Sequence, residues 1–350
     1  MTGETRALAP WADGVACEPG VAKPDPILVA DDVRRAFGGL IAVDVDHLEF
    51  QRGAVTALIG PNGAGKTTLF NLLTGFDRPD QGHWQFGGRD LAGLSAYKVA
   101  RLGMVRTFQL TKSLALLTVI ENMKLAATSQ RGERFIGGLI RPLWRNQERE
   151  IEARADELLK RFKLDHMREE FAGALSGGQR KLLEMARALM VQPELVMLDE
   201  PMAGVNPVLT QSLLGHIKDL RDEGMSVIFV EHDMDVVYDI SDWVIVLAEG
   251  RVIAEGPPDV IGTNPAVIDA YLGRHHDAPS TKEEEARELA DDEAIIAEEG
   301  RHDGDCRTDR RRTRGRRPAR RRAARRHRCR RRLRARGQHP QRVQPDTRQG

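Results

Sequence analysis

Residues 54–68 read AVTALIGPNGAGKTT, an apolar run that leads into a glycine-rich turn and a helix-like start. The turn matches G-x-x-x-x-G-K-[ST], with Gly60, Gly65, Lys66 and Thr67 in the required places. Glycine lets a backbone approach where a Cβ would collide, and successive N–H groups at a helix start form a nest for anions. The stretch therefore predicts a buried strand, a loop that binds the phosphates of a nucleoside triphosphate, and a helix.

The order of the other apolar runs predicts the fold class. Short β-branched runs at 195–199, 226–232 and 243–250 alternate with helical patterns at 207–222 and 233–240. Near-continuous apolar runs of this length are typical of buried parallel strands, and the β-α-β-α order favours a right-handed doubly wound α/β sheet.

Other stretches predict the parts around this sheet. Strand patterns occur at 27–30, 41–50 and 83–88, and apolar positions at helical spacing over about 112–172 indicate an inserted helical subdomain. Residues 1–25 show no periodicity and are expected to be a loose, disordered leader.

A second candidate site lies in LVMLDEP, residues 195–201. Its apolar strand ends in Asp199 and Glu200. A carboxylate at a strand end beside a phosphate loop can bind Mg²⁺, usually through water, and a neighbouring carboxylate can polarise an attacking water. An Asp-Glu pair alone is more often structural, but its place downstream of the phosphate loop favours the catalytic interpretation.

LSGGQ at 175–179 precedes this strand by about 20 residues, and alone it reads as a helix entry with Ser176 as N-cap. In this order, together with Gln109, His232 and the aromatic Phe37, it resembles the signature of ATP-binding-cassette (ABC) ATPases over about residues 27–273. The resemblance implies a P-loop NTPase nucleotide-binding domain over 26–275, with an antiparallel β subdomain beside the inserted helical one.

The resemblance also implies ATP and Mg²⁺ as ligands. The metal would be held by Thr67, Gln109 and Asp199, with Glu200 as general base and His232 and Gln109 also at the reacting phosphate. The residues expected to contact nucleotide are Phe37, Gly60, Pro61, Asn62, Gly63, Ala64, Gly65, Lys66, Thr67, Thr68, Ser176, Gly177, Gly178 and Gln179. Phe37 would stack on adenine.

Ser176, Gly177 and Gly178 would bind ATP held by a second ATPase subunit, because a helix start with exposed glycine amides is an anion site and the family uses it in trans. One position departs from the family pattern: Asn206 stands where most cassettes have Asp. This exchange would alter the contact between subunits there.

Further segments are similar to the branched-chain amino-acid importer ATPases, among them FGGLIAVD (37–44), VRTFQ (105–109) and DAYLG (269–273). This likeness implies import of hydrophobic amino acids through permease subunits, which receive their substrate from a binding protein. A second ATPase subunit is expected as partner, and a hetero-pair follows if the end of the chain, described below, reads into a companion ATPase. Urea importers and a lipopolysaccharide exporter are close alternatives. A soluble ABC protein that acts on ribosomes or DNA and a regulatory nucleotide-binding module are alternatives from other classes.

No run approaches the ~18 apolar residues that a membrane span needs, and the N-terminus lacks the apolar region of a secretory signal. We therefore expect a cytoplasmic protein, peripheral on the inner face of the cell membrane through its partners. The three cysteines, Cys17, Cys306 and Cys329, show no metal-binding spacing.

The end of the chain is strongly basic. Residues 301–350 hold 21 Arg and four Asp, a local charge of +17, which leaves −16 for the first 300 residues of a chain of formal charge +1. Residues 276–300 are acidic and helix-prone, and the Arg-rich tail is expected to be disordered. We interpret it as a frameshift product, because reading 332–349 one nucleotide forward permits the start of a second cassette. A nucleic-acid-binding or membrane-binding tail is the alternative, but we expect no specific nucleic-acid partner.

Overall fold

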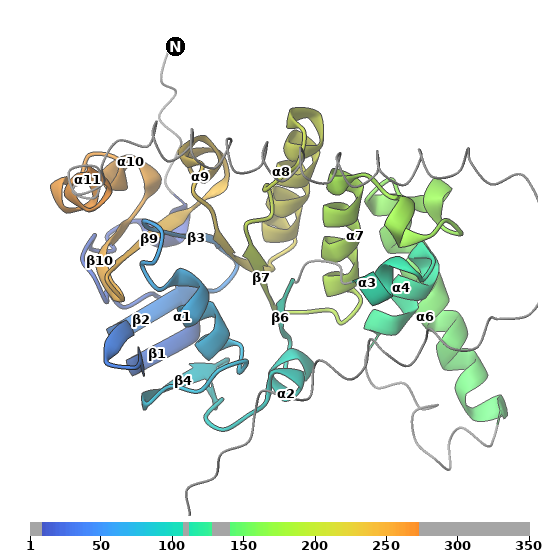
Figure 1. The fold of residues 1–350 in the computed structure, drawn as a ribbon, viewed down its shortest axis with the longest axis horizontal. Coiled ribbons are helices and arrows are strands. Elements are labelled where there is room, and N and C mark those ends of the chain that lie inside the picture. The colour runs from blue at the N-terminus through green and yellow to red at the C-terminus, as the bar shows by residue number, and fades with distance from the viewer. Residues whose placement is uncertain (1–8, 108–111, 128–140, 273–350) are drawn as a thin grey trace, which may run out of the picture. The chain divides into compact units, whose positions relative to one another are not determined.

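The computed structural model describes residues 9–107, 112–127 and 141–272. The chain divides between residues 278 and 279, and all of the described residues lie in the first unit. The acidic segment 276–300 and the Arg-rich tail, on which two of the sequence predictions fall, lie outside the described residues. The described part of the first unit contains two β-sheets and the helices that pack on them (Figure 1).

A six-stranded sheet forms the centre of this unit, in the order β10-β9-β3-β8-β7-β6. Strands β9, β3, β8, β7 and β6 pair in parallel, and β10 adds an antiparallel edge. The strands are β3 (Val55–Ile59), β6 (Met104–Arg106), β7 (Leu195–Asp199), β8 (Ser226–Val230), β9 (Trp243–Ala248) and β10 (Arg251–Gly256). Every residue of β3 and β8 is buried, as expected for strands covered on both faces.

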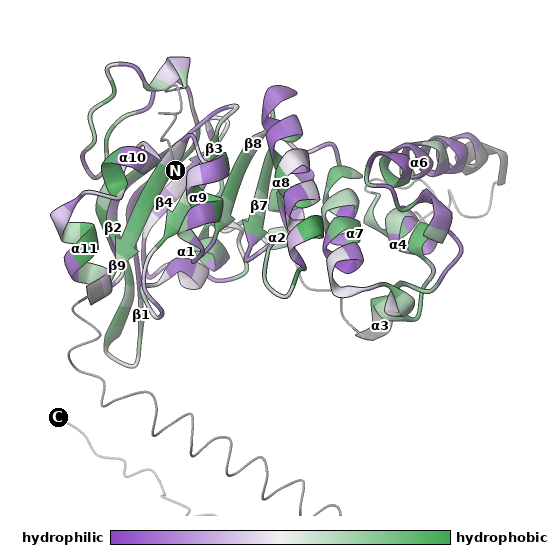
Figure 2. Ribbon diagram, turned by 90° about the horizontal axis from the view of Figure 1, so that it is seen from above, coloured by the Kyte–Doolittle hydropathy of each residue, from purple (hydrophilic) through white to green (hydrophobic). Residues whose placement is uncertain are grey.

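Alternate residues of these strands enter two different hydrophobic cores. Ala57 on β3 and Phe229 on β8 join a core shared with the helices of one face. Leu58 and Ile228, their neighbours along the strands, join a core shared with the second sheet. In Figure 2 these strands form the apolar green centre of the unit, whereas the long helix α6 is mostly hydrophilic.

The second sheet is antiparallel, in the order β2-β1-β4-β5. Its strands are β1 (Pro26–Phe37), β2 (Leu40–Gln51), β4 (Gln81–Phe86) and β5 (Arg89–Asp90). Gly38 and Gly39, with φ of 54° and 93°, make the tight turn between β1 and β2.

Helices cover the central sheet and build the helical part of the unit (Figure 1). They are α1 (Lys66–Leu73), α2 (Ala96–Arg101), α3 (Lys112–Ala115), α4 (Val119–Ala126), α6 (Arg141–Arg161), α7 (Gly177–Leu189), α8 (Pro207–Asp222), α9 (Met234–Ile240), α10 (Pro258–Ile261) and α11 (Pro265–Leu272). Short 3-10 turns occur at Pro10–Ala12, Asp165–Met167 and Ala172–Ala174. Within the stretch 112–172, where the sequence predicts a helical subdomain, the structure places α3, α4, α6 and the second of these turns.

Side-chain caps set several helix starts. Thr118 forms a capping box with Glu121 at the start of α4, and Ser176 forms one with Gln179 at the start of α7. At α8, the side chain of Asn206 accepts a hydrogen bond from the amide of Leu209.

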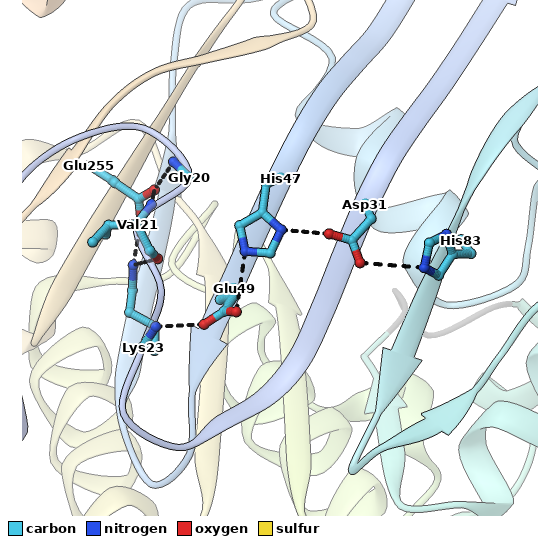
Figure 3. Close-up of polar contacts among 8 residues, drawn as sticks. All are labelled: Gly20, Val21, Lys23, Asp31, His47, Glu49, His83 and Glu255. Carbon is cyan, nitrogen blue, oxygen red and sulfur yellow. Dashed lines mark hydrogen bonds and ion pairs between the residues drawn. The ribbon is translucent and has the colours of Figure 1, made fainter.

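The leader differs from the loose segment expected at 1–25, because from residue 9 onward it packs on both sheets. Figure 3 shows the contacts: the buried carboxylate of Glu255 on β10 accepts bonds from the amides of Gly20 and Val21 and from Lys23 Nζ, the last at 2.7 Å. The amide of Lys23 donates to Glu49 on β2. The leader thereby joins β10 of the central sheet to β2 of the antiparallel sheet.

A row of polar side chains continues from Glu49 across the antiparallel sheet (Figure 3). His47 Nε2 lies 3.2 Å from Glu49 and its Nδ1 lies 2.5 Å from Asp31, which also faces His83 at 3.5 Å. Partial burial disfavours the charged ring, but the bond and charge of Asp31 and the charge of Glu49 prevail, so the pKa of His47 lies above its usual value.

Candidate functional site

The predicted phosphate loop connects β3 to α1, and its glycines are sterically required. A Cβ on Gly60, where φ is 148°, would lie 2.0 Å from the carbonyl oxygen of Leu247. A Cβ on Gly65, where φ is 100°, would lie 2.2 Å from the carbonyl oxygen of Ala42. Other side chains cannot occupy such positions without moving the backbone. The loop therefore lies tightly between β9 and β2, with its amides at the start of α1.

Lys66 lies at the first position of α1 and folds back on the loop. Its Nζ donates to the carbonyls of Gly60 at 2.6 Å and Pro61 at 3.0 Å. These bonds hold the ammonium group beside the loop amides, where it can neutralise phosphate charge.

A cavity of about 670 Å³ opens beside this loop. It brings together most of the predicted loop residues, the predicted base Glu200, and residues of the β1–β2 turn and of β2. Its lining consists of Gly39, Leu40, Ile41, Ala42, Asn62, Gly63, Ala64, Gly65, Lys66, Thr67, Thr68, Glu200 and Glu249. A cavity lined by both an anion nest and apolar side chains fits a molecule with phosphates and a flat apolar part.

Glu200 and Glu249 in this lining have left-handed backbones, with φ of 44° and 49°. Such conformations are uncommon for residues other than glycine and are concentrated at functional sites. The amide of Glu200 donates to the carbonyl of Val230 on β8, and Lys181 Nζ donates to the carbonyl of Glu200. Glu249 was not predicted from the sequence, because only the turn between β9 and β10 brings it to the cavity.

Asp199 ends β7 next to Glu200. Its Oδ2 accepts a hydrogen bond of 2.6 Å from Arg106 on the neighbouring strand β6. The carboxylate of Asp199 is thus ion-paired with Arg106 within the chain. The LVMLDEP motif does not predict this contact.

Phe37 is not part of the cavity lining, although it ends β1 just before the turn that contributes Gly39 and Leu40. Its ring is 49% exposed and stacks against the guanidinium of Arg35, 4.6 Å from the ring centroid. Arg35 is itself held by Asp77 and Asp80. The exposed apolar residues that do line the cavity at this end are Leu40 and Ile41.

The SGGQ segment lies apart from this cavity, since none of residues 176–179 lines it. Ser176 and Gly177 are exposed at the start of α7, whereas Gly178 is buried. A Cβ on Gly178 would lie 2.4 Å from Leu209 Cδ1 of α8, so this glycine is required by packing between the two helices.

His232 follows β8 with its side chain 72% exposed, and it does not line the cavity. Its neighbour Glu231 is buried, and burial raises the pKa of this carboxyl group. Glu231 Oε1 accepts a 2.9 Å bond from the amide of Met202, two residues beyond Glu200. Sequence reasoning did not single out Glu231. Gln109, predicted as a catalytic and metal-binding residue, lies outside the described residues.

The phosphate loop has sterically required glycines, two carboxylates stand at the end of β7, and the fold has two sheets. Together these features define the class of protein, which is an ATPase cassette of the ABC type. The family pattern described as ABC transporter matches residues 43–203, and that of the branched-chain amino acid ATP-binding cassette transporter matches residues 251–277. The first match includes the phosphate loop, and the second begins at β10 and includes the last described helices.

Among curated proteins, the chain is 42% identical over 250 residues to the high-affinity branched-chain amino acid transport ATP-binding protein BraF of Pseudomonas aeruginosa, covering 71% of this chain and 98% of that protein. It is 41% identical over 250 residues to the corresponding protein LivG of Escherichia coli, with the same coverage. The chain belongs to this family of ABC transporter ATP-binding proteins.

Solved structures agree with this assignment. The chain matches a nucleotide-free ATP-binding cassette from an ABC transporter with a TM-score of 0.63 and 35% identity, covering 70% of this chain and 98% of that one. It matches the ADP conformation of an ABC transporter cassette with a TM-score of 0.62 and 35% identity, covering 71% and 99%. The fold class predicted from the sequence is confirmed, and ATP hydrolysis is the activity of this class.

Proposed function

We propose that this chain is the ATP-hydrolysing subunit of an importer for branched-chain and other hydrophobic amino acids. The observation that carries the proposal is the identity of 41–42% over 250 residues to proteins named for branched-chain amino acid transport, together with the family match at 251–277. The comparisons do not favour the alternatives that the sequence left open, which were urea import, lipopolysaccharide export and action on ribosomes or DNA.

In this proposal the loop from Gly60 to Thr68 holds the phosphates through its amides, and Lys66 neutralises their charge. The base of the nucleotide lies toward the β1–β2 turn, where Leu40 and Ile41 are exposed in the cavity. Phe37 stacks on adenine from its place before this turn, while Arg35 covers its other face.

Mg²⁺ is bound through the Thr67 hydroxyl, the Asp199 carboxylate and Gln109. A hydroxyl, an amide and one carboxylate are hard oxygen donors that suit Mg²⁺, which keeps several waters and takes substrate phosphates as further ligands. Within the described residues, no group of three or more His, Cys, Asp or Glu forms a metal-binding cluster, which is compatible with so sparse a set. When bound, the ion neutralises phosphate charge.

Hydrolysis is assigned to Glu200 as the base that orients and activates water. Its place in the cavity and its left-handed backbone support this role. His232 contacts the γ-phosphate of the same nucleotide, and its exposed side chain is accessible to that ligand. Glu231 bonds the segment after Glu200 to the end of β8, which joins the segments that carry Glu200 and His232.

The SGGQ segment binds the nucleotide of a second ATPase subunit, because Ser176 and Gly177 are exposed at a helix start and none of residues 176–179 lines the cavity of its own chain. The second subunit is proposed to be a different ATPase, which makes a hetero-pair. ATP then joins the two subunits and hydrolysis separates them.

The helical subdomain is proposed to dock the permease subunits, which receive substrate from a binding protein. Leu116, Leu125 and Phe171 expose 77%, 58% and 59% of their area in this subdomain. The segments of Leu116 and Phe171 adjoin, since Thr118 and Phe171 form a β-bridge. Among the described residues no helix is long and apolar enough to cross a membrane. Through its permease subunits the protein is proposed to be peripheral on the inner face of the cell membrane.

Two measurements test the proposal. The variant Glu200→Gln should lose ATP hydrolysis by at least about a hundredfold, while it keeps ATP binding and forms a more stable nucleotide-bound dimer. Unchanged hydrolysis would refute the assigned base.

The substrate is tested in proteoliposomes that contain the chain together with the permease subunits and the substrate-binding protein of a branched-chain amino acid importer. ATP should drive uptake of radiolabelled leucine, isoleucine or valine, and Glu200→Gln should stop it. Uptake of urea in place of these amino acids, or no uptake of any of them, would contradict the proposal.

A further inference from the structure

Arg106 occupies a junction between three parts of the nucleotide site. It ends β6, three residues before Gln109, and only 6% of its side chain is exposed. Nη2 donates to Asp199 Oδ2 at 2.6 Å, and Nη1 donates to Asn71 Oδ1 at 2.6 Å. Its guanidinium also lies over the ring of Phe70, 5.5 Å from the centroid.

These contacts join the strand-end carboxylate to the helix of the phosphate loop. Asn71 and Phe70 lie on α1, the helix that begins with Lys66 and Thr67. Arg106 therefore connects β7 and α1 through two charge-assisted or polar bonds in a buried place. A planar guanidinium fixes the direction of both bonds at once, which a lysine cannot do.

The bond to Oδ2 engages one of the two oxygens of Asp199. A carboxylate that is held by one oxygen loses most of its rotational freedom, and the other oxygen then points in a set direction. Asn71 accepts a bond from the other terminal nitrogen of the guanidinium. Arg106 therefore fixes the orientation of Asp199 relative to α1, the helix that carries Thr67.

We propose that Arg106 is a positioning residue for the metal site: it holds Asp199 Oδ2 so that Oδ1 serves the hydration shell of nucleotide-bound Mg²⁺. The inference rests on the metal role that the proposed function gives to Asp199. Arg106 does not touch nucleotide or metal in this arrangement and acts only through the carboxylate.

The test measures the part of nucleotide affinity that depends on metal. The dissociation constant of a fluorescent ATP analogue is determined with Mn²⁺ and again with EDTA. The ratio of the constant in EDTA to the constant in Mn²⁺, which is the gain in affinity from the metal, is compared between variants. Arg106→Met should reduce this ratio by about tenfold, the loss typical for removal of a group that orients a metal ligand. The affinity in EDTA should change less than twofold, because the loop and Lys66 are untouched.

Arg106→Lys keeps the charge but cannot make both directed bonds, so it should recover only part of the ratio. Arg101→Met is the matched control, since Arg101 is an exposed arginine of α2 that bonds the hydroxyl of Tyr97, and it should leave the ratio unchanged. Thermal melting of each variant reports whether it is folded, and a poorly folded Arg106→Met is replaced in the comparison by Arg106→Gln.

A double-mutant cycle with Asp199→Asn separates the possible outcomes. If Arg106 acts through Asp199, adding Arg106→Met to Asp199→Asn should change the ratio less than twofold. Additive effects, or an equal loss of affinity in Mn²⁺ and EDTA, would overturn the inference and leave Arg106 as a structural residue. If Asp199→Asn by itself leaves the ratio unchanged, the metal role in the proposed function fails instead.

Discussion

Gly60 shows at the scale of single residues how closely the phosphate loop is packed. Gly60→Ala would place a Cβ 2.0 Å from the carbonyl oxygen of Leu247, so the loop or β9 must shift. We expect the variant to bind ATP at least about a hundredfold more weakly, because the amides that hold phosphate lose their arrangement. Binding of a fluorescent ATP analogue measures this loss.

Gly215→Ala is the matched control. Gly215 lies inside α8, and apart from its chain neighbours and the nearby backbone of the helix, no heavy atom lies within 4 Å of an added Cβ. Alanine is the better helix former, so the free energy of unfolding should rise by about 0.5–1 kcal/mol while ATP binding stays unchanged. Wild-type ATP affinity in Gly60→Ala would show that the loop tolerates the clash.

The sequence predicted those site residues whose chemistry is local. The phosphate loop and the Asp199-Glu200 pair are runs of neighbouring residues, and the cavity brings the loop and Glu200 together. The sequence did not reveal Glu231 or Glu249, and Arg106 appeared only as a letter in a family motif. Their roles depend on partners from other elements, such as Met202 for Glu231, and no local pattern records such pairs.

At the scale of elements, the leader is held mainly by one buried carboxylate. Glu255 accepts four hydrogen bonds, three from the leader and one of 3.0 Å from Trp243 Nε1. The side chains of Lys23 and Glu255 are 1% and 0% exposed. Trp11 of the leader also stacks on Trp243, with ring centroids 5.5 Å apart.

Lys23→Met should therefore lower the free energy of unfolding by about 3–5 kcal/mol, the usual cost of leaving a buried charge without its partner. Urea denaturation measures the change. Lys98→Met, which alters an exposed lysine of α2, should stay within about 0.5 kcal/mol of the wild type.

The double variant Lys23→Met/Glu255→Gln should recover part of the loss, because it removes the buried negative charge and leaves a neutral acceptor for the leader amides. A loss below about 1 kcal/mol for Lys23→Met, or no recovery in the double variant, would contradict the anchoring role of this pair.

Elements with a strong local sequence pattern were predictable, and the order of the leader was not. β3, β7 and β8 are apolar runs, and their burial follows from their composition. The leader has no period of its own, and its order comes from bonds to residues more than 230 positions away along the chain. A local reading of residues 9–25 could not detect those partners.

At the scale of the whole molecule, none of residues 176–179 lines the cavity beside the phosphate loop, and the proposed function has a second subunit complete the site. Gly177 is the position that tests this arrangement most cleanly. It is exposed at the first turn of α7, where an acidic residue suits the helix start, and the contact nearest to an added Cβ is Gly204 O at 3.3 Å.

Gly177→Asp, made in the Glu200→Gln background, should leave the ATP affinity of the isolated chain within about threefold of the parent. It should abolish the ATP-dependent dimer, because the new carboxylate faces the phosphates bound to the other subunit. Light scattering with ATP and Mg²⁺ measures the dimer, with the chain alone and with a second ATPase of the same family added.

Gly178→Asp is the informative contrast. Its side chain would enter the contact between α7 and α8, where Leu209 Cδ1 lies 2.4 Å from the added Cβ, so this variant should unfold at a lower temperature. Gly177→Asp should melt like its parent, which separates a defect in assembly from a defect in folding. A dimer that persists in Gly177→Asp would mean that the SGGQ segment does not reach the nucleotide of the second subunit.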